Sequence, residues 1–113
     1  MLPAKTIPVK EVREKFHLTQ EQLSRILGTS WLTISRWERG TGEPSEDAEA
    51  KLYRMNDLLR HIDTLMAADD LPKFLMTPNP AMDGFPPMDL LQSGYAFRKL
   101  VELVEKAKSG EYS

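Results

Sequence analysis

Apolar residues recur every three or four positions along most of the chain, the spacing at which side chains share one face of an α-helix. Pro8 can open a first helix, because its missing N–H group is not needed there, and His17 closes that helix. The residues at helical spacing between them are Val9, Val12, Arg13 and Phe16. No segment shows the alternation of a strand, so we expect an all-α fold.

Two capped helices separated by a glycine come after the first helix. Thr19, with Gln22 three residues later, predicts a capping box at the start of QEQLSRIL, which ends at Gly28. Ser30 predicts the cap of WLTISRWERG, which ends at Gly40. The residues expected to form the buried stripes of this pair are Leu23, Ile26, Leu27, Ile34 and Trp37.

A long fourth helix is expected from about residue 46 to residue 67, with Ser45 as its cap and Asp69 and Asp70 after its end. Its expected apolar face consists of Ala48, Leu52, Met55, Leu59, Ile62 and Met66. We place a boundary here, between a module of residues 1–68 and a second module of residues 69–113.

The second module begins with a proline-dense segment, PKFLMTPNPAMDGFPPMDLL, in which long helices are excluded. We expect short helices over 72–76 and from Pro86 to near Gly94, and a last helix over 95–108. The residues of this last helix expected to face inward are Phe97, Leu100, Val101 and Val104.

Charge is also unevenly distributed along the chain. Residues 1–45 carry seven Lys or Arg against five Glu, a balance of +2, and residues 46–113 carry eight against twelve acids, a balance of −4. A basic first half suits phosphate, and an acidic second half suits a different partner. The chain contains no cysteine, and its start, MLPAKTIPVKEV, lacks the apolar stretch of a signal peptide. We therefore expect a cytoplasmic protein with no membrane contact.

Catalytic chemistry has little support in this sequence. The two histidines, His17 and His61, have no partner at ligand spacing, and the adjacent Asp69 and Asp70 are typical of a solvated helix end. We expect no enzymatic activity, no catalytic or metal-binding residue, no cofactor and no small-molecule substrate.

The segment LTQEQLSRILGTSWLTISRWERGTGEP places two capped helices and a glycine turn at the separation that a helix-turn-helix requires. Its residue pattern resembles that of the Xre and lambda-repressor class, which runs roughly L-S-Q-E-E-L-A, a glycine turn, S-x-x-T-I-S-x-W-E-x-G and a proline. The resemblance implies a lambda-repressor-like DNA-binding module. It implies that Gln20 and Arg39 meet phosphate and that Trp31, Leu32, Thr33 and Arg36 face the major groove of double-stranded DNA.

Two of these positions depart from the family, which usually has polar residues where Trp31 and Leu32 stand. Contact with thymine methyl groups becomes possible at these positions, and direct hydrogen-bond readout of base edges is reduced. The alternative is that Trp31 packs on the first helix or on another subunit. We expect Trp37 to lie in the core and Glu38 to cap or pair within the fold.

Residues 72–110 resemble the toxin-binding domain of the Xre, MbcA and ParS antitoxin family, through F-L-x-T-P-N-P, a glycine, P-x-D-L-L, S-G and a closing amphipathic helix. The resemblance implies a type II toxin–antitoxin system. The partner would be a RES-domain toxin that consumes NAD, and the antitoxin would block its active site, bind operator DNA and regulate its own transcription. Toxin contacts would come from Asn79, Tyr95, Arg98, Lys108, Gly110, Glu111 and Tyr112, although the last two can equally be a frayed terminus.

Two further possibilities stay open at this point. The chain can be a plain helix-turn-helix transcription regulator whose second module only dimerises, or a protein-binding adaptor whose helix-turn-helix no longer binds DNA. A single recognition helix covers only a half-site, so we expect a homodimer or a higher assembly.

Overall fold

The computed structural model describes residues 8–110, and this part of the chain is helical without strands. The all-α fold class expected from the sequence is confirmed. The elements are α1 (Val9–Lys15), α2 (Gln20–Leu27), α3 (Trp31–Arg39), α4 (Glu46–Ile62), the 3-10 helix η1 (Ala68–Asp70), α5 (Leu71–Met76), the 3-10 helices η2 (Pro80–Met82) and η3 (Pro87–Leu91), and α6 (Gly94–Ser109).

The caps predicted for α2 and α3 are confirmed. The Thr19 hydroxyl accepts from the backbone N–H of Gln22, and the Gln22 side chain accepts from the backbone N–H of Thr19, which completes a capping box. Ser30 accepts from the N–H of Thr33 in the same way at the start of α3. Gly28 and Gly40 end the two helices with φ of 73° and 80°, a left-handed conformation that costs glycine little.

The fourth helix differs from the prediction at its C-terminus and on its buried face. It ends at Ile62 rather than near residue 67, because the chain turns there and brings Leu71 and Leu75 of α5 back onto the core. Leu58 is fully buried, whereas Leu59, which the sequence pattern placed on the apolar face, is only half-buried. Both are one turn from Met55, and the elements that α4 packs against, α1, α2, η3 and α6, decide which of the two is buried.

The two short helices predicted after Leu71 are present as α5 and η3, and the structure adds the 3-10 turn η2 between them. Helix η3 contacts α4, α5 and α6 and so helps to hold α6 against α4. Arg54 of α4 donates to the carbonyl oxygen of Leu91 at 2.9 Å, and Gln92 donates to that of Ile26 in α2 at 3.3 Å. Leu100 and Val104 of α6 are buried as expected. Phe97 and Val101 are only half-buried, because at 100° per residue they point to one side of the face of α6 that Leu100 and Val104 bury.

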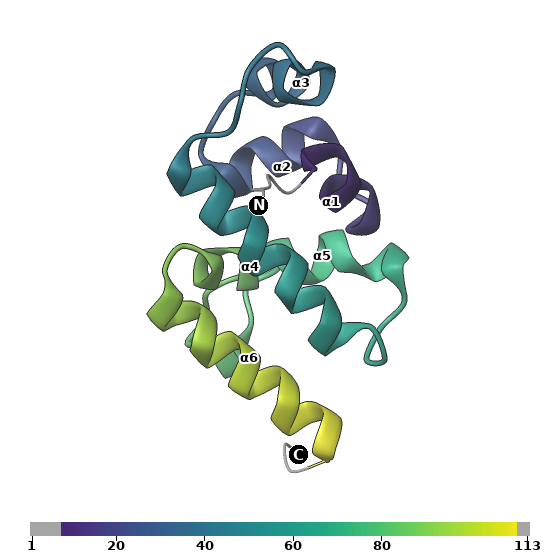
Figure 1. Cartoon of the computed structure of the whole chain (residues 1–113). Coiled ribbons are helices and arrows are strands. Elements are labelled where there is room, and N and C mark those ends of the chain that lie inside the picture. The colour runs from purple at the N-terminus through teal and green to yellow at the C-terminus, as the bar shows by residue number, and fades with distance from the viewer. Residues whose placement is uncertain (1–7, 111–113) are drawn as a thin grey trace, which may run out of the picture.

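One hydrophobic core runs through the described part of the chain, from Val9 of α1 to Val104 of α6. Figure 1 shows α4 crossing the middle of the molecule, with α3 at one end and α6 at the other. The molecule is elongated, with principal extents of 46 × 32 × 24 Å. Because this single core extends across the proposed boundary between residues 68 and 69, the division into two modules stays a prediction. Among residues 8–110, no helix is long and apolar enough to cross a bilayer.

Candidate DNA-binding surface and partner groove

Helix α3 lies on α2 and α1 with only one face buried. Ile34 is fully buried, as predicted. Trp37, which we expected in the core, is half-buried and packs against the core from its edge. At 100° per residue, Leu32, Arg36 and Arg39 lie on the side of α3 opposite Ile34. All three are exposed or partly exposed, so this side of the helix is free to meet a partner.

The side chains predicted to contact DNA gather at this end of the molecule. We call the set Trp31, Leu32, Thr33, Arg36 and Arg39 the recognition face. Trp31 is 54% exposed and Leu32 is 43% exposed, so Trp31 is not buried against α1. It lines a shallow hollow with Gln20 and Glu21 at the start of α2.

The polar groups of the recognition face differ in whether they already have a hydrogen-bond or ionic partner within the fold. The Thr33 hydroxyl lies 2.9 Å from that of Ser30, so the two satisfy each other. Within residues 8–110, the structure gives neither Arg36 nor Arg39 an ionic partner. The positive charge of this face is therefore available for phosphate or base contacts.

Glu38 turns away from the recognition face and joins three helices. Its carboxylate accepts from Arg13 Nε at 2.7 Å and Nη2 at 3.0 Å, and from Gln20 Nε2 at 3.0 Å. Burial raises the pKa of Glu38, but the hydrogen bonds from Arg13 and Gln20 outweigh burial and leave the pKa below its ordinary value. The expected pairing of Glu38 within the fold is confirmed. No signal in the sequence indicated that Gln20, predicted to bind phosphate, also binds Glu38.

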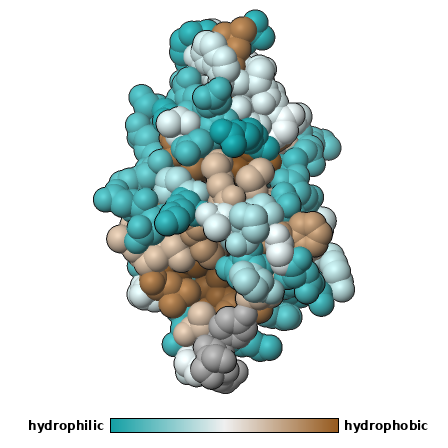
Figure 2. Space-filling view, turned by 180° about the vertical axis from the view of Figure 1, so that it is seen from behind, coloured by the Kyte–Doolittle hydropathy of each residue, from teal (hydrophilic) through white to brown (hydrophobic). Residues whose placement is uncertain are grey.

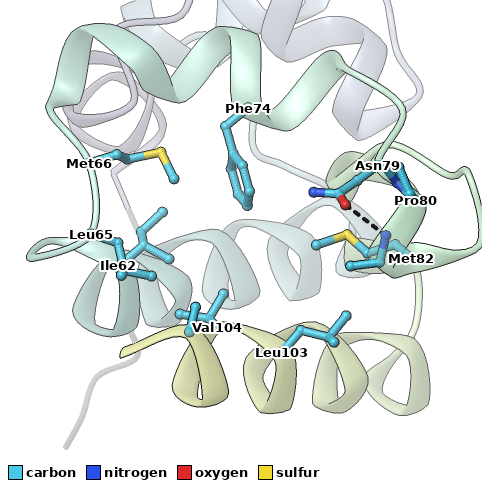
Figure 3. A pocket seen from close by; sticks show the side chains of 11 residues that line it. Ile62, Leu65, Met66, Phe74, Asn79, Pro80, Met82, Leu103 and Val104 are labelled. Atoms are coloured by element: carbon cyan, nitrogen blue, oxygen red, sulfur yellow. Dashed lines mark hydrogen bonds between the residues drawn. The ribbon is translucent and has the colours of Figure 1, made fainter. Parts of the chain in front are cut away.

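A second surface lies at the other end of the molecule, where α4, α5, η2 and α6 enclose a largely apolar cavity of about 440 Å³. We call it the α4–α6 groove. Figure 3 shows Phe74 and Met66 on one side of it and Leu103 and Val104 of α6 on the other. From behind, apolar side chains gather over this half of the molecule (Figure 2).

Asn79 supplies the polar group of this groove. Its Oδ1 accepts from the N–H of Ala81 at 2.9 Å, which caps η2 and fixes the orientation of the amide. The amide nitrogen then turns toward Phe74 (Figure 3). The groove thus combines an apolar lining with an oriented hydrogen-bond donor, a composition that suits an apolar group carrying a hydrogen-bond acceptor.

A second hollow lies beside the groove and shares Leu103 with it. Tyr95, Lys99 and Leu103 line this hollow, and Leu103 and Ala107 line the groove, so a stripe at i, i+4 spacing faces both. Phe85, 56% exposed, borders the second hollow. Sequence reasoning missed the roles of Leu103, Ala107 and Phe85, although the i, i+4 stripe was visible in the last helix.

The residues predicted to bind toxin are spread along this end. Asn79 lines the groove and Tyr95, 71% exposed with Lys99 Nζ 5.4 Å from its ring centroid, lines the second hollow. Arg98 and Lys108 are exposed on α6 but line neither hollow, and Gly110 ends the helix. Glu111 and Tyr112 lie outside the described residues.

The two histidines connect elements that are distant in sequence. His17 Nδ1 lies 2.9 Å from Asp69 Oδ1, and His61 Nδ1 of α4 lies 2.6 Å from Glu105 Oε2 of α6. The hydrogen bond from His61 is the main reason that the pKa of Glu105 lies below its ordinary value. These contacts help to hold α6 and η1 in place. Across residues 8–110, no cluster of His, Asp and Glu is arranged to hold a metal ion.

Comparison with known proteins agrees with this architecture. Residues 9–48 match the helix-turn-helix family. Among solved structures, the chain is similar to one chain of the M. tuberculosis MbcT-MbcA toxin-antitoxin complex, with 20% identity and a TM-score of 0.78 over 94% of this chain and 95% of that one. No curated protein sequence matches the chain. Residues 9–48 therefore form a helix-turn-helix domain, and the described part of the chain has the fold of the matched chain of that complex.

Proposed function

We propose that this protein is an antitoxin that binds operator DNA through its recognition face and neutralises a toxin through its α4–α6 groove. The observation that carries the proposal is the fold similarity to a chain of a toxin–antitoxin complex, which spans both ends of the molecule. The helix-turn-helix at one end supplies a surface for DNA binding, and the α4–α6 groove at the other end supplies a separate surface for toxin binding.

DNA binding is supported by the charge and exposure of α3. Arg36 and Arg39 lie on the outer side of the helix, while the one carboxylate of α3, that of Glu38, is held inward by Arg13. A helix with this arrangement can enter a major groove with its positive groups toward the duplex. We propose that two copies of the chain occupy paired half-sites in the promoter of its own gene and repress transcription.

Toxin binding is supported by the groove and the hollow beside it. Together they give α6 an exposed stripe of Tyr95, Lys99, Leu103 and Ala107 that has no covering segment within residues 8–110. The sequence resemblance names the partner as a RES-domain toxin that consumes NAD. In our proposal the antitoxin blocks the toxin's active site, acts in the cytoplasm and carries out no chemistry itself.

Co-expression with a RES-domain toxin, taken from an adjacent reading frame where one is encoded there, tests the toxin half of the proposal. The antitoxin should restore growth and the cellular level of NAD. Ala107→Glu places a charge at the mouth of the groove and should abolish the rescue. Ser109→Glu adds the same charge on the other side of α6 and should leave the rescue intact. Failure of the wild-type chain to rescue would exclude the antitoxin role and leave a plain transcription regulator.

A gel-shift titration with the DNA upstream of its own gene tests the other half. Binding should weaken steeply as salt is raised, because Lys and Arg side chains that meet phosphate release counterions. A complex whose affinity does not change with salt, or no complex at all, would contradict the proposed DNA binding. Rescue of growth in the co-expression experiment without DNA binding would identify a protein-binding adaptor whose helix-turn-helix no longer binds DNA.

A further inference from the structure

The first turn of α3 presents an apolar surface where a DNA-reading helix ordinarily presents polar groups. Trp31 and Leu32 are adjacent and exposed by 54% and 43%. Water would normally disfavour two large apolar side chains side by side at the tip of a helix, and a partner that covers them removes that cost.

The neighbouring polar side chains are already occupied within the fold. The hydroxyls of Ser30 and Thr33 bond to each other at 2.9 Å, and Ser30 also accepts from the Thr33 N–H at 3.1 Å. The amide nitrogen of Gln20 donates to Glu38. Apart from the indole N–H of Trp31, the side chains at this end of α3 therefore offer hydrocarbon rather than free donors and acceptors.

The charges beside this apolar pair identify its partner. Leu32 shares the outer side of α3 with Arg36 and Arg39, and Glu38 is withdrawn into its pair with Arg13. A second copy of the same face would bring like charges together, whereas a duplex brings phosphates to the arginines. In the major groove, the apolar group that base edges display is the C5-methyl of thymine.

We infer that Trp31 and Leu32 read thymine methyl groups, so that the operator half-site carries thymines beneath the first turn of α3. The inference rests on the proposed DNA binding and adds the base that this face selects. Arg36, one turn further along the helix, then supplies the polar contact, with guanine as its preferred base. Specificity is divided between a hydrocarbon contact and a single charged side chain.

The test replaces thymine by deoxyuridine, which lacks only the methyl group, in a duplex that the protein has selected from a random-sequence pool. One methyl contact is worth a change of about fourfold in affinity. We expect a loss of that size at one or two thymines of each half-site. The ratio between the thymine and uracil duplexes should fall to near unity for Leu32→Ala or Trp31→Ala at the thymine that each side chain covers.

Arg36→Ala provides the matched control, since it should weaken binding to both duplexes and leave the thymine-to-uracil ratio unchanged. Full affinity for duplexes with uracil at every thymine, or a ratio that persists in both alanine variants, would overturn the inference. So would sedimentation equilibrium showing that Trp31→Ala or Leu32→Ala breaks a DNA-free dimer, since these side chains would then be an interface between subunits. If the pool yields no duplex, the proposed DNA binding itself fails.

Discussion

Arg13 and Glu38 form a two-point ion pair that ties the first helix to the third, with N–O distances of 2.7 and 3.0 Å. The two side chains are 17% and 7% exposed, so solvent screens the pair only weakly. Because Glu38 lies on α3, between the outer face and the core, this pair fixes the angle at which the recognition face leaves the molecule.

Removing one member of this pair should destabilise the protein. Glu38→Gln leaves the Arg13 charge half-buried without its counterion, and we expect a loss of about 2 kcal/mol in the free energy of unfolding. Urea denaturation followed by circular dichroism measures it. Glu11→Gln removes an exposed i, i+4 pair with Lys15 and should cost less than about 0.5 kcal/mol. Equal losses in the two variants would show that the Arg13–Glu38 pair stabilises the fold no more than an exposed ion pair does.

Acid should weaken the fold through the same carboxylate. The folded-state pKa of Glu38 lies below its ordinary value, so its contribution to stability is fully present above about pH 4.3 and is lost as the pH falls through the folded-state pKa. Glu105, whose pKa is lowered chiefly by His61, acts in the same direction. Denaturant titrations from neutral pH to pH about 3 should show a shallower decline for Glu38→Gln than for the wild type. Glu102→Gln, on the exposed side of α6, should behave as the wild type does.

The two adjacent leucines of α4 should respond very differently to truncation. Leu58→Ala empties a fully buried position and should cost about 3 kcal/mol. Leu59 is half-buried, so Leu59→Ala should cost about 1 kcal/mol. Thermal or urea unfolding of the pair decides the matter, and the reverse order of the two losses would restore the assignment made from the sequence.

The two outward-facing arginines of α3 should separate specificity from affinity. Arg39→Ala should weaken binding to every duplex about equally and reduce the slope of log affinity against log salt by about 1. Arg36→Ala should also relax base preference, because its side chain lies nearer the first turn of the helix. Binding titrations with matched and mismatched duplexes over a salt series distinguish the two. Identical behaviour of both variants would contradict this division of roles.

The sequence predicts the N-terminal helices well, because their boundaries are set locally. Thr19, Ser30 and Ser45 cap α2, α3 and α4 through bonds to residues only three positions away. Gly28 and Gly40 end α2 and α3 through the left-handed conformation of a single residue. Such signals depend on neighbouring residues alone and can therefore be recognised in the sequence.

The remainder depends on contacts between distant residues. The choice of Leu58 over Leu59 as the buried side chain depends on the elements that pack against α4, which are α1, α2, η3 and α6. The end of α4 depends on Leu71 and Leu75 returning to the core. The partner of Glu38 is Arg13, 25 positions earlier, a separation that no helical period marks. The α4–α6 groove likewise exists only once α5 and η2 have folded over α6.

Helix α4 runs from the helix-turn-helix to the groove without a glycine or proline between Glu46 and Ile62. An uninterrupted helix of this kind fixes both the distance and the relative orientation of the two surfaces. Under the proposed function, a toxin bound at the far end would project away from the double helix. The spacing of two operator half-sites in the promoter would then set the distance between two bound toxins.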